Sequence, residues 1–148
     1  MEFTTVVKSF EELSPIELYK ILRLRNEVFV VEQNCPYQDA DNKDPKCCHL
    51  MLLKDNELMA YARLVPPGLS FPQMSIGRVV TSPKARGTGA GRVLMNTAIE
   101  QCHKIFGEGN IQIGAQAYLL KFYSSLGFNQ VSDVYDEDGI PHIDMIRA

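Results

Sequence analysis

Features that would mark a membrane, secreted or zinc-binding protein are missing from this sequence. Unbroken runs of aliphatic or aromatic residues, such as Val28–Val31, are short, whereas a membrane span needs about 20 apolar residues. The N-terminal stretch lacks the basic segment and apolar core of an export signal. The four cysteines show neither CxxC spacing nor the density of a disulfide scaffold, and the histidines show no metal-ligand spacing. We therefore expect a cytoplasmic protein with reduced thiols, no membrane association and no metal site.

Acidic residues are absent from one long stretch. The chain of 148 residues holds 18 Asp and Glu, yet none lies between Leu58 and Ile99, where a proportional share would be about five. The basic residues of that stretch are Arg63, Arg78, Lys84, Arg86 and Arg92. Positive charge is concentrated there, although the net charge of −3 gives the chain as a whole no attraction for nucleic acid. We expect a local anion site and no nucleic-acid partner.

The remaining composition is that of one globular α/β domain spanning residues 1–148, with 45% hydrophobic and 22% charged residues. Periodicity and turn residues predict strands at 3–8, 48–54, 58–65, 74–81, 110–114, 128–135 and 140–146. They predict helices at 14–32, 88–105 and 118–126. The order β-α-β-β-β-α-β-α-β-β indicates a mixed sheet, because the strand-helix-strand unit at 74–114 favours a parallel pair while the hairpins are antiparallel. Ligands of such sheets bind beyond the carboxyl ends of the parallel strands, near Val80–Ser82 and Gly114–Ala117.

A glycine-rich turn lies between the strand at 74–81 and the helix that follows. It reads Arg86-Gly87-Thr88-Gly89-Ala90-Gly91-Arg92. Glycine has no Cβ, so the backbone can approach an oxyanion closely, and the N–H groups and dipole of a helix start favour an anion. The turn lacks the Gly-Lys-Ser/Thr ending of a Walker loop, and Arg92 stands where the dinucleotide fingerprint GxGxxG needs its third glycine. We interpret the turn as a phosphate cradle of neither type.

The turn and a later stretch resemble the cofactor motifs of the GNAT superfamily of N-acetyltransferases. Arg78–Pro83 followed by Arg86–Gly91 is similar to its strand and its Arg/Gln-x-x-Gly-x-Gly/Ala pyrophosphate loop. Gln116–Phe128 is similar to its second cofactor motif, a helix with a tyrosine before a Leu-Gly-Phe turn, although Gln116 replaces the asparagine of many members. Arg25–Gln33 and Asp138–Ile143 are similar to the ElaA-like subgroup. The resemblance covers nearly the whole chain.

This resemblance implies a GNAT-like acyl-CoA N-acyltransferase fold with acetyl-CoA as the cofactor. The main chain of Val79 and Val80 would pair with the pantetheine arm as though it were an added strand, which requires the parallel strands to splay at that point. The cofactor-binding residues that it implies are Val79, Val80, Arg86, Gly87, Thr88, Gly89, Ala90, Gly91, Arg92, Gln116, Leu119 and Tyr123.

Acetyl transfer from a thioester to an amine needs an uncharged amine, a donor for the oxyanion and a proton for the thiolate. A backbone N–H near Val80 could serve the oxyanion. The resemblance places Tyr123 at the thiolate, as proton donor or as hydrogen-bond partner of the sulfur, and a buried tyrosine with a structural role is the alternative. The base stays open between a water chain and four side chains: Glu27, Glu32, His142 and Asp144. Imidazole is suited to this work because its charge changes near neutral pH, so His142 is a candidate for catalysis.

The acceptor-binding candidates are Arg25, Phe29, Glu32 and His142. Helical spacing places Arg25 on the apolar face of its helix, where it either binds a substrate carboxylate or pairs internally with Glu32 or Asp41. The acidic segment 39–44 does not match an EF-hand loop, and it could attract a cationic amine.

These observations predict an N-acetyltransferase that transfers the acetyl group directly to a small-molecule or peptide amine in a ternary complex. Two alternatives remain. Arg25–Phe29 also resembles the start of the acyl-homoserine-lactone synthases, which share the fold, and a cofactor cradle alone would suit a non-catalytic acyl-CoA-binding or regulatory module. Edge strands near the C-terminus leave a homodimer open.

Overall fold

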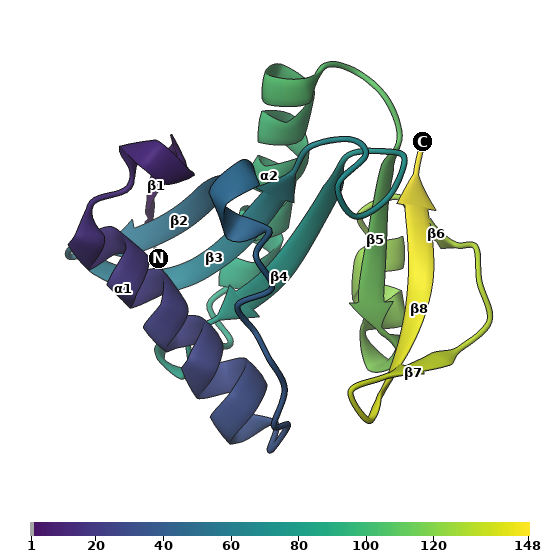
Figure 1. Ribbon diagram of the computed structural model, residues 1–148, viewed down its shortest axis with the longest axis horizontal. Helices are drawn as coiled ribbons and strands as arrows, with labels where there is room; N and C mark the ends of the chain where they lie inside the picture. Colours follow the sequence, from purple (N-terminus) through teal and green to yellow (C-terminus); the bar gives the residue numbers. More distant parts are fainter. Residues whose placement is uncertain (1) are drawn as a thin grey trace.

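A computed structural model describes residues 2–148 (Figure 1). The predicted α/β class is confirmed, and the order of elements is the predicted one with one additional short strand near the C-terminus. The strands are β1 (Thr4–Ser9), β2 (Cys48–Lys54), β3 (Glu57–Val65), β4 (Ser75–Thr81), β5 (Ile111–Gln116), β6 (Phe128–Gln130), β7 (Tyr135–Glu137) and β8 (Ile140–Arg147). The α-helices are α1 (Pro15–Arg25), α2 (Ala90–Phe106) and α3 (Leu120–Ser124). A π-helical segment, η2 (Asn26–Glu32), and the 3₁₀ turns η1 (Phe10–Glu12), η3 (Asp44–Lys46), η4 (Pro83–Ala85) and η5 (Ala117–Leu119) complete the chain.

The first helix begins where the capping residues predict. Ser14 Oγ accepts a hydrogen bond from the Glu17 N–H at 3.1 Å, and Glu17 Oε1 accepts one from the Ser14 N–H at 2.8 Å. The helical path then continues through η2, where bonds from residue i to i−5 appear, such as the Gln33 N–H to Val28 O at 3.0 Å. Asn34, with φ of 49°, ends it. The predicted extent to about residue 32 is confirmed, and the change to π geometry lies outside what a 3.6-residue period predicts.

The strands form two sheets in place of the one mixed sheet that we predicted. β1, β2, β3 and β4 are antiparallel neighbours in that order, while β5, β8 and β6 form the second sheet, with β7 also paired to β8. The predicted parallel pairing of β4 and β5 is reduced to one bridge between Met74 and Ile111, beside a hydrogen bond from the Gln112 N–H to Met74 O at 3.1 Å. Figure 1 shows β4 and β5 separating toward their carboxyl ends. The separation has a local cause in β4, because its pairing with β3 shifts register between Tyr61 and Arg63, and such bulges bend a strand.

Helix α2 holds the glycine turn against the first sheet. Its apolar stripe includes Leu94, Ala98 and Cys102, all fully buried in the core that it shares with β3 and β4. Because the helix is fixed along its length by this packing, its first turn has a fixed position next to the carboxyl end of β4.

The C-terminal part differs from the prediction in two places. The strand predicted at 128–135 is interrupted, because the Val131 N–H bonds Asp144 O at 2.9 Å and the Asp144 N–H bonds Ser132 Oγ at 2.8 Å. It therefore divides into β6 and β7. The helix predicted at 118–126 starts as the 3₁₀ turn η5 and is only a short α-helix that ends at Ser124, and Gly127, with φ of 93°, ends the turn that follows it. Within residues 2–148 no helix combines the length and the apolar character that a membrane crossing requires.

Candidate active site

The glycine turn presents its backbone to open space. Gly87 and Gly89 have φ angles of 77° and 83°, and a Cβ at either position would meet no atom within 4 Å. Thr88 Oγ1 donates to Ala85 O, which closes the turn, and the side chain of Ala90 is buried. The N–H groups in the first turn of α2 have no carbonyl four residues earlier in the helix to bond. The turn therefore offers unpaired N–H groups at the positive end of a 17-residue helix, as a phosphate cradle requires.

The two arginines that flank the turn have protein partners. Arg86 forms a two-pronged ion pair with Glu32, at 2.8 Å from Nη1 and 2.5 Å from Nη2, and both side chains are almost half exposed. The hydrogen bonds from Arg86 lower the pKa of Glu32 below its usual value. Arg92 lies over the ring of Phe122 at 5.5 Å and donates to Ser125 Oγ at 2.9 Å. Glu32 thus lies beside the glycine turn, where its carboxylate is paired with Arg86, the side chain that we expect to bind phosphate.

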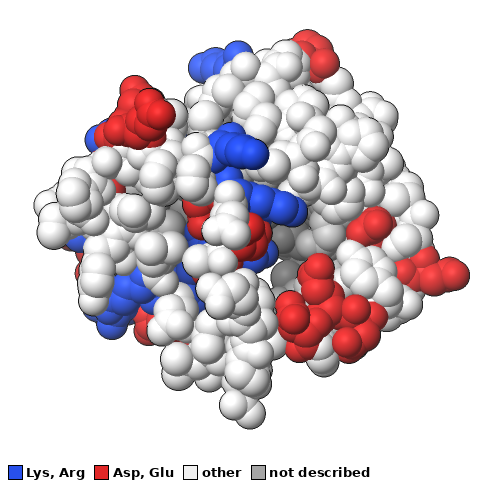
Figure 2. All heavy atoms as spheres, in the orientation of Figure 1, with Lys and Arg blue, Asp and Glu red and all other residues white. Residues whose placement is uncertain are grey.

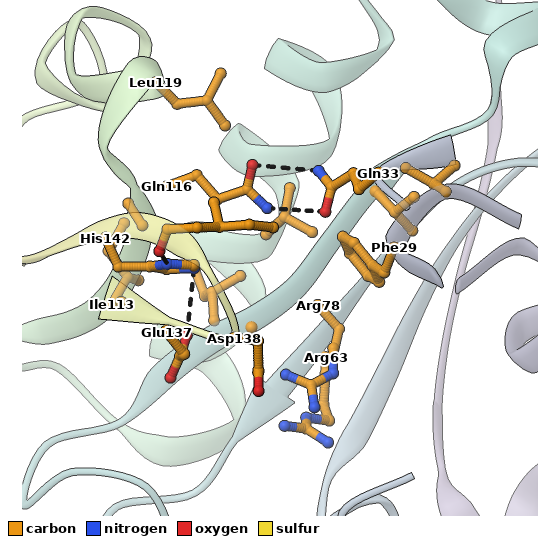
Figure 3. A pocket seen from close by; sticks show the side chains of 18 of the residues that line it. Phe29, Gln33, Arg63, Arg78, Ile113, Gln116, Leu119, Glu137, Asp138 and His142 are labelled. Atoms are coloured by element: carbon orange, nitrogen blue, oxygen red, sulfur yellow. Dashed lines mark hydrogen bonds and ion pairs between the residues drawn. The ribbon is translucent and has the colours of Figure 1, made fainter. Parts of the chain in front are cut away.

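A cavity of about 1060 Å³ lies between the diverging strands β4 and β5, and η2 and the β7–β8 hairpin complete its wall (Figure 3). The expected site residues that line it are Phe29, Glu32, Val79, Val80, Arg86, Gly91, Gln116, Leu119, Tyr123 and His142. Those outside its lining are Arg25, Gly87, Thr88, Gly89, Ala90 and Arg92. The structure therefore brings the two cofactor motifs and the late histidine to one cavity, with the glycine turn at its edge.

The main chain of β4 is available for pairing beside this cavity. The side chain of Val80 packs in the core with Ile21 and Met51, so it does not cover the edge of the strand that borders the cavity. The β3-facing edge of β4 is paired, whereas among residues 2–148 no strand pairs with its other edge at Val79 and Val80. An extended ligand could add to this edge as a strand would.

Tyr123 is a buried aromatic residue that lines the cavity. Its side chain is packed edge-on against Phe122 and Phe128, with ring centroids 5.2 and 6.0 Å away. Burial raises the pKa of the phenol above its usual value, so the hydroxyl keeps its proton throughout the neutral range. We find no hydrogen bond from this hydroxyl to any residue in the described part of the chain. It is a proton donor that the protein itself leaves unused.

His142, on β8, is held by two contacts (Figure 3). Its Nδ1 lies 2.8 Å from Ile140 O, and because a carbonyl only accepts, Nδ1 carries a proton. Its Nε2 lies 3.2 Å from Glu137 Oε2, and its ring stacks on Tyr135 with centroids 6.1 Å apart. In the neutral imidazole the lone pair is therefore on Nε2 and faces the Glu137 carboxylate, which can only accept, so this contact is an ion pair only when Nε2 also carries a proton. Glu137 also lines the cavity.

Two contacts span the cavity between elements that are far apart in sequence. The amides of Gln33 and Gln116 each donate to the other, both at 3.2 Å, and join the end of η2 to the end of β5 (Figure 3). Cys35 Sγ donates to Asp138 O at 3.2 Å. Sequence reasoning missed Gln33, Cys35 and Glu137 as site residues, because only the tertiary structure brings their elements together.

The other base candidates occupy different environments. Glu27 pairs with Arg23 at 3.1 Å on the outer side of the helix and does not line the cavity. Asp144 does line it, and its Oδ1 accepts a hydrogen bond from Tyr135 Oη at 2.6 Å. The geometry thus leaves Glu32, His142 and Asp144 in the cavity and removes Glu27 from it.

The structure corrects the expectation that Arg25 contacts the substrate. Its side chain is 0% exposed, and it bonds Asp39 Oδ2 through Nε at 2.9 Å and Asp44 Oδ1 through Nη1 at 2.8 Å. Internal pairing was the alternative interpretation, but the partners are these two aspartates and neither Glu32 nor Asp41. Arg25 therefore supports the site from behind.

Arg25 belongs to a buried ionic network that fixes segment 35–47 onto β3 and β4. Its ion pairs are Arg25 to Asp39 and Asp44, Arg63 to Asp41 and Asp44, and Arg78 to Asp39 and Asp41. Burial alone would raise the pKa of Asp44, but hydrogen bonds and charge from Arg25 and Arg63 outweigh it and hold that pKa below its usual value. The segment 39–44 does not act as a free acidic patch, as we had expected, because these arginines neutralise its aspartates.

Comparison with known proteins agrees with this geometry. The family model described as acetyltransferase (GNAT) domain matches residues 20–148. The chain is 46% identical over 138 residues to the protein ElaA of Escherichia coli, covering 92% of this chain and 90% of that protein. The crystal structure of E. coli ElaA has a TM-score of 0.93 to this chain, at 42% identity and over 99% and 100% of the two chains. An acyl-CoA N-acyltransferase from Pseudomonas aeruginosa has a TM-score of 0.94, at 44% identity and the same coverage. The fold alone extends to an aminoglycoside 6′-N-acetyltransferase complexed with coenzyme A, at 16% identity, over 96% of each chain, with a TM-score of 0.70.

Proposed function

Because this chain belongs to the GNAT acetyltransferase family, we propose that it transfers the acetyl group of acetyl-CoA to a primary amine by direct attack in a ternary complex. The observation that carries the proposal is the single parallel bridge between Met74 and Ile111, beyond which β4 and β5 diverge. The divergence leaves a cavity with an unpaired strand edge at Val79 and Val80, and the glycine turn lies at the end of that edge.

Acetyl-CoA fits this arrangement in three parts. The N–H groups at Gly87–Gly91 would bind its diphosphate, the edge of β4 would pair with the amides of its pantetheine arm, and the thioester would lie near Tyr123. Gln116 and Leu119 line the same cavity and would contact the arm from the other side. The side chains of Thr88 and Ala90 are turned away, so these residues would contribute their main chains.

The reaction needs one bond to form, one to break and one proton to cross the site. The amine nitrogen attacks the thioester carbonyl, and a backbone N–H near Val80, on the unpaired edge of β4, stabilises the oxyanion; one such donor contributes about 10²–10³ in rate. The C–S bond then breaks, and the hydroxyl of Tyr123 protonates the departing thiolate. His142 Nε2 takes the proton that the amine loses, and the carboxylate of Glu137 at 3.2 Å stabilises the resulting imidazolium.

The proposal is tested by thiol release from acetyl-CoA with and without primary amines. Amine-dependent release with a matching N-acetylated product supports it. Tight coenzyme A binding with no release for any amine would favour the non-catalytic module instead. The acyl-homoserine-lactone alternative is tested in the same assay, because it requires a lactone product in place of an N-acetylated amine.

Replacing Gly89 with leucine is expected to weaken coenzyme A binding about tenfold or more. The side chain would stand in the open space above the turn and block close approach of a phosphate, and losing one charge-assisted hydrogen bond costs about 1.5–3 kcal/mol. Gly107→Leu is the matched control, because Gly107 ends the same helix with φ of 94° and also has no neighbour within 4 Å. Gly107→Leu carries at least as much backbone strain, because the ψ of Gly107 is 170°, in a region essentially restricted to glycine, whereas the ψ of Gly89 is 7°. Only Gly89→Leu should change the calorimetric Kd. Equal Kd values in the two variants would refute the cradle.

Replacing Glu32 with glutamine is expected to tighten coenzyme A binding by about two- to fivefold at low salt, and by less at high salt. The reason is that Glu32 competes with phosphate for Arg86, which it holds through two hydrogen bonds. Glu27→Gln serves as the control, since Glu27 pairs with Arg23 away from the cavity. Titrations at two salt concentrations measure the effect, and weaker binding in Glu32→Gln would show that the carboxylate itself contacts the ligand.

A further inference from the structure

The cavity has two walls of opposite charge at the end that lies away from Leu119 (Figure 3). The basic wall is formed by residues of segment 35–47, β3 and β4: Lys43, Arg63 and Arg78. The acidic wall is formed by residues of the β7–β8 hairpin: Glu137, Asp138 and Asp144. Figure 2 shows basic atoms, with some acidic atoms between them, on one side of the central hollow, and a group of acidic atoms alone on the other.

The basic wall has one cation more than the buried network balances. Within the network three arginines face three aspartates, so their formal charges cancel. Lys43 is additional: its Nζ donates to Ser70 Oγ at 3.1 Å, and among residues 2–148 no carboxylate lies within 4 Å of it. The side chain is half-buried and lines the cavity, where an ammonium is more stable beside an anion than beside a hydroxyl alone.

Arg78 is fixed rigidly at the same wall. Its φ is 50°, a conformation that long side chains rarely adopt and that persists where the surroundings enforce it, often at binding sites. Its Nε lies 2.8 Å from Asp39 Oδ1, and its guanidinium lies over the ring of Tyr37 at 5.7 Å. Asp41 links it to Lys43, since it lies 3.4 Å from Arg78 Nη2 and 3.1 Å from the Lys43 N–H. Asp41 therefore holds both the guanidinium of Arg78 and the main chain of Lys43, and both residues line the cavity.

The acidic wall lies beside the residue proposed as the base. Glu137 is 3.2 Å from His142 Nε2, and Asp144 accepts from Tyr135 at 2.6 Å. In the described chain none of the three carboxylates has a lysine or arginine nitrogen within 4 Å. An ammonium entering the cavity would thus be attracted to the wall where its proton must be removed.

We propose that the acceptor is a primary amine that also carries an anionic oxygen group, with its amine at the acidic wall and its anion at Lys43 and Arg78. This proposal takes the acetyl transfer from the proposed function, and it takes the charges of the acceptor from the two walls of the cavity. A simple alkylamine would leave Lys43 without an anion, and a diamine would place a second cation against it, so both should be poor acceptors. A carboxylate and a phosphate offer the same oxygen chemistry.

The test uses amines of several chain lengths, matched at each length so that only the distal group differs. The series is the ω-amino carboxylates from glycine to 6-aminohexanoate, their carboxamides, the corresponding diamines, and O-phosphoethanolamine. Binding to the protein saturated with coenzyme A is measured by calorimetry, and thiol release from acetyl-CoA is measured separately. We expect the best anionic amine to bind about tenfold or more tightly than its carboxamide and its diamine. The order of the carboxylate and phosphate members identifies the anion.

Lys43→Gln should bring the ratio between carboxylate and carboxamide close to one. Lys46→Gln should leave it unchanged, because Lys46 is exposed on the same segment and does not line the cavity. Equal binding of carboxylate and carboxamide, tighter binding of the diamine, no binding by any member, or an unchanged ratio in Lys43→Gln would each overturn the acceptor class. Preferential binding of anionic amines without thiol release would support the two-wall site and refute acetyl transfer. Thiol release without that preference would support acetyl transfer and refute the two-wall site.

Discussion

Tyr123→Phe is expected to lower kcat by about 10²–10⁴-fold while the Kd for coenzyme A changes by less than about threefold. The hydroxyl is the only part of the side chain that the substitution removes, and burial keeps it protonated at neutral pH. The aromatic packing against Phe122 and Phe128 stays in place, so the fold and the cavity wall should be unaffected. Single-turnover thiol release with the best amine measures the chemical step, and calorimetry measures the affinity.

The matched control for this prediction is Tyr19→Phe. Tyr19 loses the same atom from the outer face of α1, where its side chain is 71% exposed and far from the cavity lining. Its kcat should equal that of the unmodified protein. If Tyr123→Phe also keeps full kcat, the phenol is not the proton donor, and the thiolate leaves protonated by water.

Arg25→Met is expected to lower the free energy of unfolding by about 3–5 kcal/mol. Methionine has a similar length, but it leaves Asp44 in a buried environment with one cationic partner fewer and removes the bond to Asp39. The loss should be largest near neutral pH, where the carboxylates are charged. It should shrink in acid, because a carboxylate with a lowered pKa contributes stability that disappears as the pH falls through that value. Urea unfolding at neutral and acidic pH measures both effects.

Arg23→Met distinguishes the buried network from a general effect of losing charge on α1. Arg23 pairs with Glu27 at 3.1 Å on the exposed side of the helix, and such pairs contribute about 0.3–0.5 kcal/mol. A destabilisation of Arg25→Met no larger than that of Arg23→Met would mean that the Arg25 ion pairs contribute no more than an exposed pair, and that Arg63 and Arg78 are sufficient to hold the aspartates of segment 35–47.

The elements that local chemistry determines were predictable from the sequence. The capping box at Ser14 starts α1, and Gly127 ends the turn after α3 with positive φ. Asp55 and Asn56 turn the β2–β3 hairpin with φ angles of 51° and 63°, which these residue types tolerate. The glycine turn belongs to the same class, because its function depends on its own backbone and the helix that follows.

Features that depend on contacts between distant segments were not predictable in the same way. The order of strand, helix and strand favours a parallel pair, but it does not say that only Met74 and Ile111 would keep the pairing. Likewise, helical spacing placed Arg25 inside, yet its partners Asp39 and Asp44 lie in a segment with no regular period, so no pattern could select them. Glu137 was missed for the same reason, since only the β7–β8 register brings it to His142.

The hydrogen bonds between the Gln33 and Gln116 amides affect how a ligand binds at this point of the cavity. Each amide uses one N–H and one oxygen site in this pair, so a peptide-like arm either bonds to the remaining sites of Gln116 or separates the pair and replaces its bonds. A bond that replaces one of the pair gives a small net gain, about 1 kcal/mol or less, and a ligand that separated the pair without an amide of its own would leave two half-buried amides unsatisfied. The pair therefore favours ligands whose amides can bond to these two side chains over ligands that separate the side chains without replacing their hydrogen bonds.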